Sequence, residues 1–144
     1  ALEKPVTPEP GRIVTFKLGG NAELPSPLDY LVVESPKAPL AGDAETWQVG
    51  MQRFAENCQF CHGAYAISSG VIPDLRWSAI SASEDSWAAV VRDGALTANG
   101  MVGFSDIIDD DEIEAIRLYV LRQAWLAVEN GTADAPELAA AGDH

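Results

Sequence analysis

Apolar residues recur at helical spacing in three stretches of the chain. In the first stretch, Trp47, Met51, Phe54 and Cys58 follow the i, i+4, i+7, i+11 pattern of one helix face. Asp43 stands just ahead of this stretch, and aspartate is a preferred N-cap residue. The pattern therefore predicts an amphipathic helix that leads the chain directly to Cys58.

Two further helices are predicted downstream. The second begins after Ser83 and ends near Gly94, because glycine commonly follows a helix C-terminus. The third runs from about Asp109 to Ala127, and Asp109 with Glu112 three residues later resembles a capping box. Their apolar faces consist of Trp87, Val90 and Val91 in one helix and of Ile113, Ile116, Val120 and Ala124 in the other.

The two flanks of this helical region have a different composition. Residues 1–44 contain seven of the nine prolines, which disfavour helices and central strands, and we expect an extended arm or linker there. Within the arm, the segment Gly11–Gly20 has glycines at both ends and residues that favour β-structure between them, which predicts one short strand. Residues 129–144 are acidic and poor in large apolar residues, so we expect a loosely ordered tail. The expected fold is all-α, with a helical domain at 45–128.

The charge balance excludes several classes of partner. Acidic residues outnumber basic ones 22 to 9, which gives a net charge of −13. A chain this acidic has no basic patch for nucleic acid and is repelled by anionic lipid surfaces. Its apolar runs are far shorter than the roughly 20 residues of a membrane span. The start of the sequence lacks a basic and then apolar segment, so we expect a mature protein or an excised piece.

Both cysteines and one of the two histidines lie within the pentapeptide Cys58-Gln59-Phe60-Cys61-His62. This pattern is typical of covalent c-type heme attachment. Two thiols about one helical turn apart can add to the two vinyl groups of one porphyrin, and the adjacent imidazole of His62 then ligates the iron. We therefore expect one heme c, attached through Cys58 and Cys61.

Three other interpretations of the pentapeptide are weaker. A thioredoxin-like redox motif belongs in a βαβ setting, whereas the surroundings here are predicted to be helical. A zinc site needs about four ligands, and the chain has no second cysteine–histidine pair. A structural disulfide between residues three apart on a helix would be strained.

Met101 is the candidate for the sixth iron ligand. It lies in a predicted loop between glycines, Gly100 and Gly103, which allow a backbone to approach a flat ring closely. A thioether opposite histidine is a known arrangement in cytochromes c. Met51 is expected to pack in the core on the wrong side, and His144 ends the tail. A gap-filling role for Met101 is the alternative.

Four more residues are candidates for contacts around the heme. The Pro73 carbonyl is a candidate acceptor for the imidazole proton of His62, since a ligating histidine usually has such a partner. Arg76, Trp77 and Trp87 carry donor groups that suit heme propionates. Ordinary packing or surface placement is the alternative for each of these three residues.

Taken together, these residues resemble the class I cytochrome c domain over about residues 45–127. The matching positions are Gly50, Phe54, Cys58, Cys61, His62, Gly63, Pro73, Asp74, Leu75, Gly94, Gly100, Met101, Phe104 and Tyr119. In that family the first and last helices cross, with a small residue against an aromatic one. The resemblance implies that Gly50, Phe54 and Tyr119 make this crossing, and that the chain transfers single electrons.

A narrower resemblance concerns the flanks. Gly11–Gly20, the proline-containing linker and the helical domain follow the order seen at the C-terminus of quinohemoprotein alcohol dehydrogenases that use pyrroloquinoline quinone (PQQ). This resemblance implies a PQQ-containing propeller domain, fused or associated, as electron donor. It also implies a redox protein or oxidase as acceptor, and a periplasmic location.

No propeller repeat or catalytic acid motif is found in the chain, so we expect an electron-transfer domain rather than an enzyme. Two alternatives remain open. One is a free-standing periplasmic cytochrome c. The other is a heme sensor or peroxidase-like enzyme, which would need an open iron site.

Overall fold

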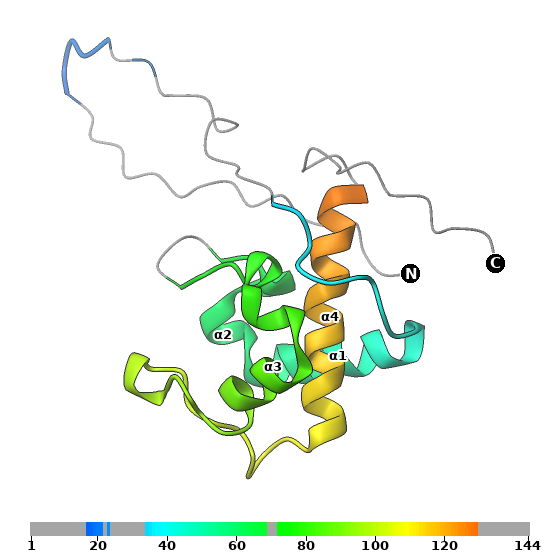
Figure 1. The fold of residues 1–144 in the computed structure, drawn as a ribbon. Helices are drawn as coiled ribbons and strands as arrows, with labels where there is room; N and C mark the ends of the chain where they lie inside the picture. The colour runs from blue at the N-terminus through cyan, green and yellow to red at the C-terminus, as the bar shows by residue number, and fades with distance from the viewer. Residues whose placement is uncertain (1–16, 22, 24–33, 69–71, 130–144) are drawn as a thin grey trace.

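A computed structural model describes residues 17–21, 23, 34–68 and 72–129, and their regular elements are all helical (Figure 1). This confirms the all-α expectation. The four α-helices are α1 (Ala44–Asn57), α2 (Gln59–His62), α3 (Glu84–Val91) and α4 (Asp110–Glu129). Four short 3₁₀ turns connect them: η2 (Ala64–Ala66), η3 (Leu75–Trp77), η4 (Ala79–Ala82) and η5 (Thr97–Asn99).

The predicted caps of α1 and α4 are formed by their side chains. Asp43 Oδ1 accepts hydrogen bonds from the backbone N–H of Thr46 at 2.9 Å and from its hydroxyl at 2.8 Å. At α4, the Glu112 amide donates to Asp109 Oδ1 at 2.8 Å, and the Asp109 amide donates to Glu112 Oε2 at 3.3 Å. This reciprocal pair is a capping box, which satisfies two amides that the helix itself leaves unpaired.

α1 crosses α4 at very close range (Figure 1). Gly50 is buried at the crossing, where a methyl group would overlap the Ala115 carbonyl and approach the Cβ of Tyr119 to 2.8 Å. One turn further along α1, the ring of Phe54 packs on that of Tyr119 with centroids 5.4 Å apart. The absence of a side chain at Gly50 thus lets the two backbones touch, and the aromatic pair fixes their angle.

A single hydrophobic core joins α1, α3 and α4. Its buried members come from all three helices and the loops between them: Phe54, Cys58, Ala66, Trp87, Val91, Ile108, Ile113, Ile116, Tyr119 and Val120. Partly buried side chains, Met101 and Leu75 among them, pack against it from the connecting loops. Because Cys58 belongs to this core, the end of α1 is held in place by packing rather than by local hydrogen bonds alone.

The segment 34–43 contains neither helix nor strand and passes along α4 (Figure 1). Two indole N–H groups hold it: Trp125 donates to the Ala38 carbonyl at 3.0 Å, and Trp47 donates to the Ala41 carbonyl at 2.8 Å. This part of the predicted arm is therefore extended chain bound to the helical domain.

Most of the predicted strand Gly11–Gly20 lies outside the described residues, as does most of the predicted tail, 130–144. The described end of the strand segment is a turn, closed by the Gly20 amide donating to the Lys17 carbonyl at 2.9 Å. The domain boundaries at 44 and 128 remain predictions.

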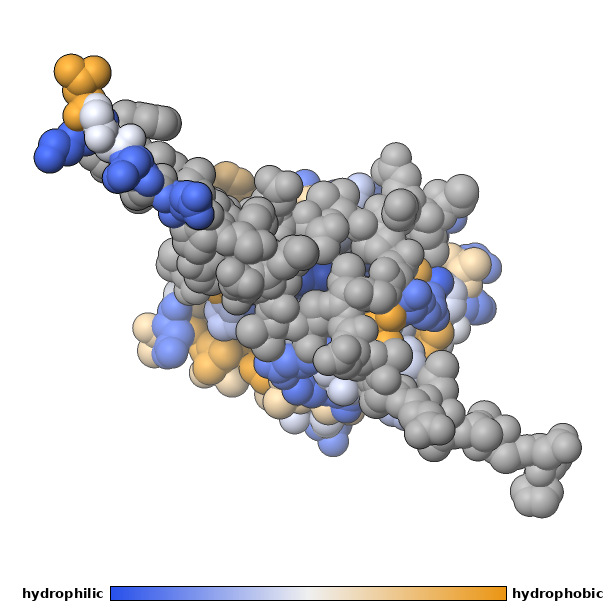
Figure 2. Space-filling model, turned by 90° about the horizontal axis from the view of Figure 1, so that it is seen from above, coloured by the Kyte–Doolittle hydropathy of each residue, from blue (hydrophilic) through white to orange (hydrophobic). Residues whose placement is uncertain are grey.

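On the face shown in Figure 2, hydrophobic and hydrophilic residues are interspersed over the described surface. Among the described residues, no helix is both long enough and apolar enough to cross a membrane.

The close crossing of α1 and α4 gives a stability test. Gly50→Ala is expected to lower the free energy of unfolding by about 3 kcal/mol, because the new methyl group overpacks against backbone. The loss should appear although alanine favours a helix over glycine by about 1 kcal/mol. Urea unfolding measures it. Val49→Ala, at an exposed neighbouring position, should change stability by no more than about 0.5 kcal/mol, and an equally small effect at Gly50 would contradict the overlap.

Candidate functional site

One cavity of about 400 Å³ brings together residues that are far apart in the sequence. Its volume lies in the range of small-molecule and cofactor sites, about 300–1,000 Å³. Cys58, Cys61, His62, Pro73 and Met101, all singled out in the sequence, line it. The remaining walls are mostly apolar and come from α1, α3 and α4, the 3₁₀ turns and the loops between them: Phe54, Ile72, Leu75, Ile80, Trp87, Val90, Val91, Leu96 and Ile116, with Ser78, Asn99 and Gly100.

The two thiols are presented where α1 passes into α2. The Cys58 amide still donates to the Phe54 carbonyl at 2.8 Å, and the Cys58 carbonyl accepts from His62 at 2.9 Å, so the chain makes one further helical turn. Both cysteines are free thiols, one buried and one exposed. Burial, with a smaller contribution from Cys61, raises the pKa of Cys58 to about 12. Two reduced thiols, one turn apart, therefore face the same cavity.

The chain reverses direction immediately after His62. Gly63 has φ +73°, and a side chain there would overlap the Ile67 carbonyl, so only glycine fits this close approach. Tyr65 and Ala66 also have positive φ values of 59° and 61°, which is uncommon outside glycine. Ala66 is completely buried, so the tertiary packing holds this turn in place.

His62 is half-buried, and its Nδ1 atom is buried. Burial lowers the pKa of His62, and the nearby backbone carbonyl of Pro73 acts as an acceptor that partly offsets this change. No hydrogen bond with full geometry reaches Nδ1 from the described residues. The Pro73 carbonyl is thus a close but imperfectly aligned partner, as is common where a site tightens only on binding its ligand.

Met101 lies in a loop that closes on itself before Met101 and is tied back to α3 after it. The Met101 amide donates to the Leu96 carbonyl at 3.2 Å, directly after Gly100, whose φ is +94°. The Phe104 amide donates to the Val91 carbonyl at 2.8 Å. These bonds fix the backbone on either side of Met101, so the loop holds the thioether at the cavity wall.

α3 and its C-terminal glycine provide the base of this loop. The helix starts after Ser83, as predicted, and the Ser83 hydroxyl caps it by accepting from the Ser86 amide at 3.3 Å. Gly94 has φ +69° and ends the helical turn, and a side chain there would approach the Gly103 amide to 2.9 Å. The two glycines let the two ends of the loop touch.

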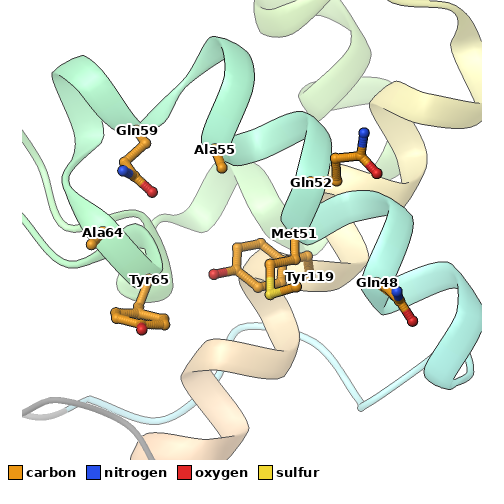
Figure 3. Close-up of a pocket in the computed structure, with 8 residues that line it drawn as sticks. All are labelled: Gln48, Met51, Gln52, Ala55, Gln59, Ala64, Tyr65 and Tyr119. Carbon is orange, nitrogen blue, oxygen red and sulfur yellow. The ribbon is translucent and has the colours of Figure 1, made fainter. Parts of the chain in front are cut away.

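Met51 lies elsewhere. It lines a separate open groove of about 540 Å³, whose other walls are Gln48, Gln52, Ala55, Gln59, Ala64, Tyr65 and Tyr119. Figure 3 shows Met51, from α1, and Tyr119, from α4, among the side chains that line this groove. Of the two methionines, only Met101 contributes to the cavity wall.

The three candidate propionate donors differ in their surroundings, and their role toward a heme stays a prediction. Arg76 and Trp77 are not among the cavity-lining residues, and Arg76 is paired with Asp74 at 2.7 Å. Trp87 lines the cavity, but its single N–H donates to the Ile113 carbonyl at 3.0 Å. An indole has only one donor hydrogen, so this contact favours the packing alternative for Trp87. The sixth-ligand alternative His144 lies outside the described residues.

Several wall residues were missed in the sequence. Ile72 and Ile80 come from the irregular stretch between the first two predicted helices, where no periodicity marks an inward side, and Leu75 from the same stretch was noted only as part of a family pattern. Asp74 was noted only as part of a family pattern, and its contact with Arg76 two residues later has no sequence signature.

Comparison with known proteins finds relatives among quinone-dependent alcohol dehydrogenases. The chain is 37% identical over 115 residues to quinohemoprotein alcohol dehydrogenase ADH IIB of Pseudomonas putida, covering 79% of this chain and 16% of that protein. It is 40% identical over 116 residues to the dehydrogenase subunit of an alcohol dehydrogenase (quinone) of Komagataeibacter europaeus, covering 78% and 15%.

A solved structure has the same fold. Quinohemoprotein alcohol dehydrogenase ADHIIG from Pseudomonas putida HK5 matches with a TM-score of 0.60 and 28% identity, over 80% of this chain and 16% of that one. The matched part of the chain thus spans about one sixth of the length of these relatives.

A family model spans most of the helical domain. The model described as cytochrome c oxidase, cbb3-type, subunit III matches residues 45–120, from the start of α1 into the middle of α4. This range contains every described residue that the sequence singled out for the cavity. The chain therefore belongs to this cytochrome c family, whose cofactor is heme c, and is homologous to the electron-transfer heme domain of quinohemoprotein alcohol dehydrogenases.

Proposed function

We propose that the cavity holds one heme c, bound covalently through Cys58 and Cys61, and that the chain transfers single electrons through it. The observation that carries this proposal is the meeting of two free thiols, an imidazole and a thioether around one apolar cavity. When bound, the heme supplies one-electron chemistry by cycling its iron between the ferrous and ferric states.

The donor set fits this cofactor. The two thiols are one helical turn apart and face the cavity with His62 directly after them, which suits two thioether bonds and one axial ligand on the same side. Met101 approaches from a different loop, so its thioether can serve as the second axial ligand. The Pro73 carbonyl is the candidate acceptor for the remaining imidazole proton of His62.

The other residues of the chain exclude water and keep the ligands in place. Apolar walls from α1, α3 and α4 surround the site, and a low-polarity environment of this kind influences the potential of a redox centre. Both ligand-bearing segments are tied to core helices by backbone hydrogen bonds. A site held this firmly changes little in geometry when an electron arrives or leaves.

For the partner we propose a PQQ-containing dehydrogenase domain, fused or associated, that passes electrons to this heme. The names of the similar proteins are those of quinohemoprotein and quinone-dependent alcohol dehydrogenases, and about five sixths of their length lies outside the match. A redox protein or oxidase would be the acceptor. Two thioether bonds to heme and an acidic chain suit a periplasmic carrier.

A free-standing periplasmic cytochrome c is the alternative to a dehydrogenase-linked domain. An open-site sensor or peroxidase is disfavoured, because Met101 occupies the wall of the cavity where an exchangeable ligand would have to bind.

Covalent attachment is tested by extraction. Chain produced with a cytochrome c maturation system should keep its pigment after treatment with acidified acetone, because thioether bonds survive it. Its intact mass should exceed that of the polypeptide by one heme. Cys58→Ala/Cys61→Ala should release any pigment under the same treatment. Extraction of the pigment from the unmodified chain would refute covalent attachment.

The axial ligand is tested by substitution of the two methionines. Met101→Ala should abolish the weak sulfur-to-iron charge-transfer band of the ferric protein and let added imidazole or cyanide bind. Met51→Leu should leave the band intact, since Met51 lies in the other groove. Absorption spectroscopy of both variants measures this. A band that persists in Met101→Ala contradicts the assignment.

The division of labour is tested by activity. The isolated chain should be reduced and reoxidised by small redox mediators but should not oxidise alcohols, even with PQQ and calcium added, because it lacks a propeller repeat. A full-length quinohemoprotein alcohol dehydrogenase is the positive control. Alcohol oxidation by the isolated chain would contradict the proposal. An open reading frame with a signal peptide directly before Ala1 would favour the free-standing cytochrome.

A further inference from the structure

The open groove that contains Met51 shares a wall with the cavity. Gln59 lines the groove, and Cys58 directly before it lines the cavity, so the short helix α2 begins between the two. A second contact crosses the same wall. Phe54, which lines the cavity, packs on Tyr119, which lines the groove, with ring centroids 5.4 Å apart. Whatever covers the groove therefore lies close to the cavity, behind α2 and this aromatic pair.

No charged side chain is among the described residues that line the groove. They are three glutamines, two tyrosines, two alanines and a methionine, with Gln52 and Ala55 on the exposed side of α1 (Figure 3). Glu56 stands beside them, but it accepts from Gln52 at 2.9 Å and is paired with Arg53 at 2.8 Å. Further along, residues 57–73 contain no Asp, Glu, Lys or Arg, although 22% of the whole chain is charged. The strong negative charge of the chain thus lies outside this region.

Phe60 lies in α2 between a groove residue and a cavity residue. It directly follows Gln59, which lines the groove, and directly precedes Cys61, which lines the cavity. Its side chain is 100% exposed. Interfaces between proteins are enriched in aromatic residues and Met and depleted of charged residues at their centre, and aromatic side chains often dominate the binding energy. The groove residues and Phe60 match this composition, and we call them together the neutral face.

The neutral face suits a partner that is held nearby rather than one that arrives by diffusion. Freely diffusing partners gain speed and orientation from complementary charge, and this face carries no charge of its own. Interfaces between domains of one chain are more polar than permanent subunit interfaces, and the three glutamines give the face that character. In the similar dehydrogenases about five sixths of the length lies outside the match, which is enough for a large attached domain.

We propose that the neutral face is the docking surface for the electron-donating dehydrogenase domain, whose own contact surface is uncharged and has an apolar recess for Phe60. The inference rests on the proposed function and names the part of this chain that receives the donor. Each transfer oxidises the reduced PQQ of the donor by one electron and reduces ferric heme iron to ferrous, while the protons of the reduced quinone pass to solvent. The Met101 loop, on the opposite side of the cavity, stays free for the acceptor.

The experiment uses the complete holoprotein that contains this chain, or the holo-chain with its associated PQQ dehydrogenase. Alcohol is added in a stopped-flow spectrometer, and heme reduction is followed by absorption. Phe60→Ser and Ala55→Arg should each slow this reduction at least about tenfold, because one removes an aromatic anchor and the other places charge and bulk in the groove. Both positions are exposed, so the variants are expected to fold, and their intact mass should still include one heme.

Two matched controls carry the same kinds of change elsewhere. Ile107→Ser removes another exposed apolar side chain, and Val49→Arg places the same charge on α1 outside the groove. Both should leave heme reduction by alcohol within about twofold of the unmodified protein. Ascorbate with a small mediator should reduce all four variants at the unmodified rate, since the cavity is unaltered. Reduction by alcohol should also change less than about twofold between about 0.03 and 0.3 M salt, because screening acts on charged contacts.

Unchanged reduction by alcohol in Phe60→Ser and Ala55→Arg would overturn the proposal, and so would a strong salt dependence. Slower reoxidation by an acceptor protein, with unchanged reduction by alcohol, would overturn it by placing the acceptor on this face. A dimer of the unmodified chain that both variants dissociate in analytical ultracentrifugation would also overturn it, since the occupant would then be a second copy. Failure of the unmodified protein to reduce its heme with alcohol would instead refute the proposed donor, which keeps the two failures distinct.

Discussion

The contact between Gly50 and the backbone of α4 is the constraint on which the remaining structure depends. Because no side chain separates α1 from the Ala115 carbonyl, the two helices cross at the shortest possible distance, and the Phe54–Tyr119 pair then fixes their angle. One turn later α1 ends at Cys58, inside the same core. The position of the thiols is therefore set from outside the cysteine motif, by a crossing that contains no chemically reactive residue.

The opposite side of the cavity depends on a different kind of restraint. Met101 has no helix of its own, and its loop gains definition from two glycines that let its ends meet and from amides that donate back to α3. The two sides are thus held by unlike means, one by helix packing and the other by loop hydrogen bonds. Both sides pack on the same core, which contains Cys58, Trp87 and Val91 and against which Met101 packs.

The helices and the residues of the cavity were predictable because their signals are local. Apolar periodicity and capping side chains marked α1, α3 and α4, and the Cys58–His62 pentapeptide and the glycine-flanked Met101 marked the site. The placement of Arg76 was not predictable. Its guanidinium could turn toward the cavity or toward Asp74, and the choice of Asp74 depends on the three-dimensional burial of the pair. For Trp87 the indole donor pairs with the Ile113 carbonyl, which is 26 residues away in the chain. Partners at such separations leave no trace in a short motif.

The two indole hydrogen bonds to segment 34–43 have a consequence for any domain that precedes it. They bind the chain to α4 at the carbonyl of Ala38 and to α1 at that of Ala41, so a tether leaves the domain from a fixed place and its free length is shortened. A tether with a fixed exit confines whatever it carries to a limited volume, which raises the effective concentration of one module at the other. For a donor joined in this way, encounter with the cavity is governed by tether geometry and no longer by bulk concentration.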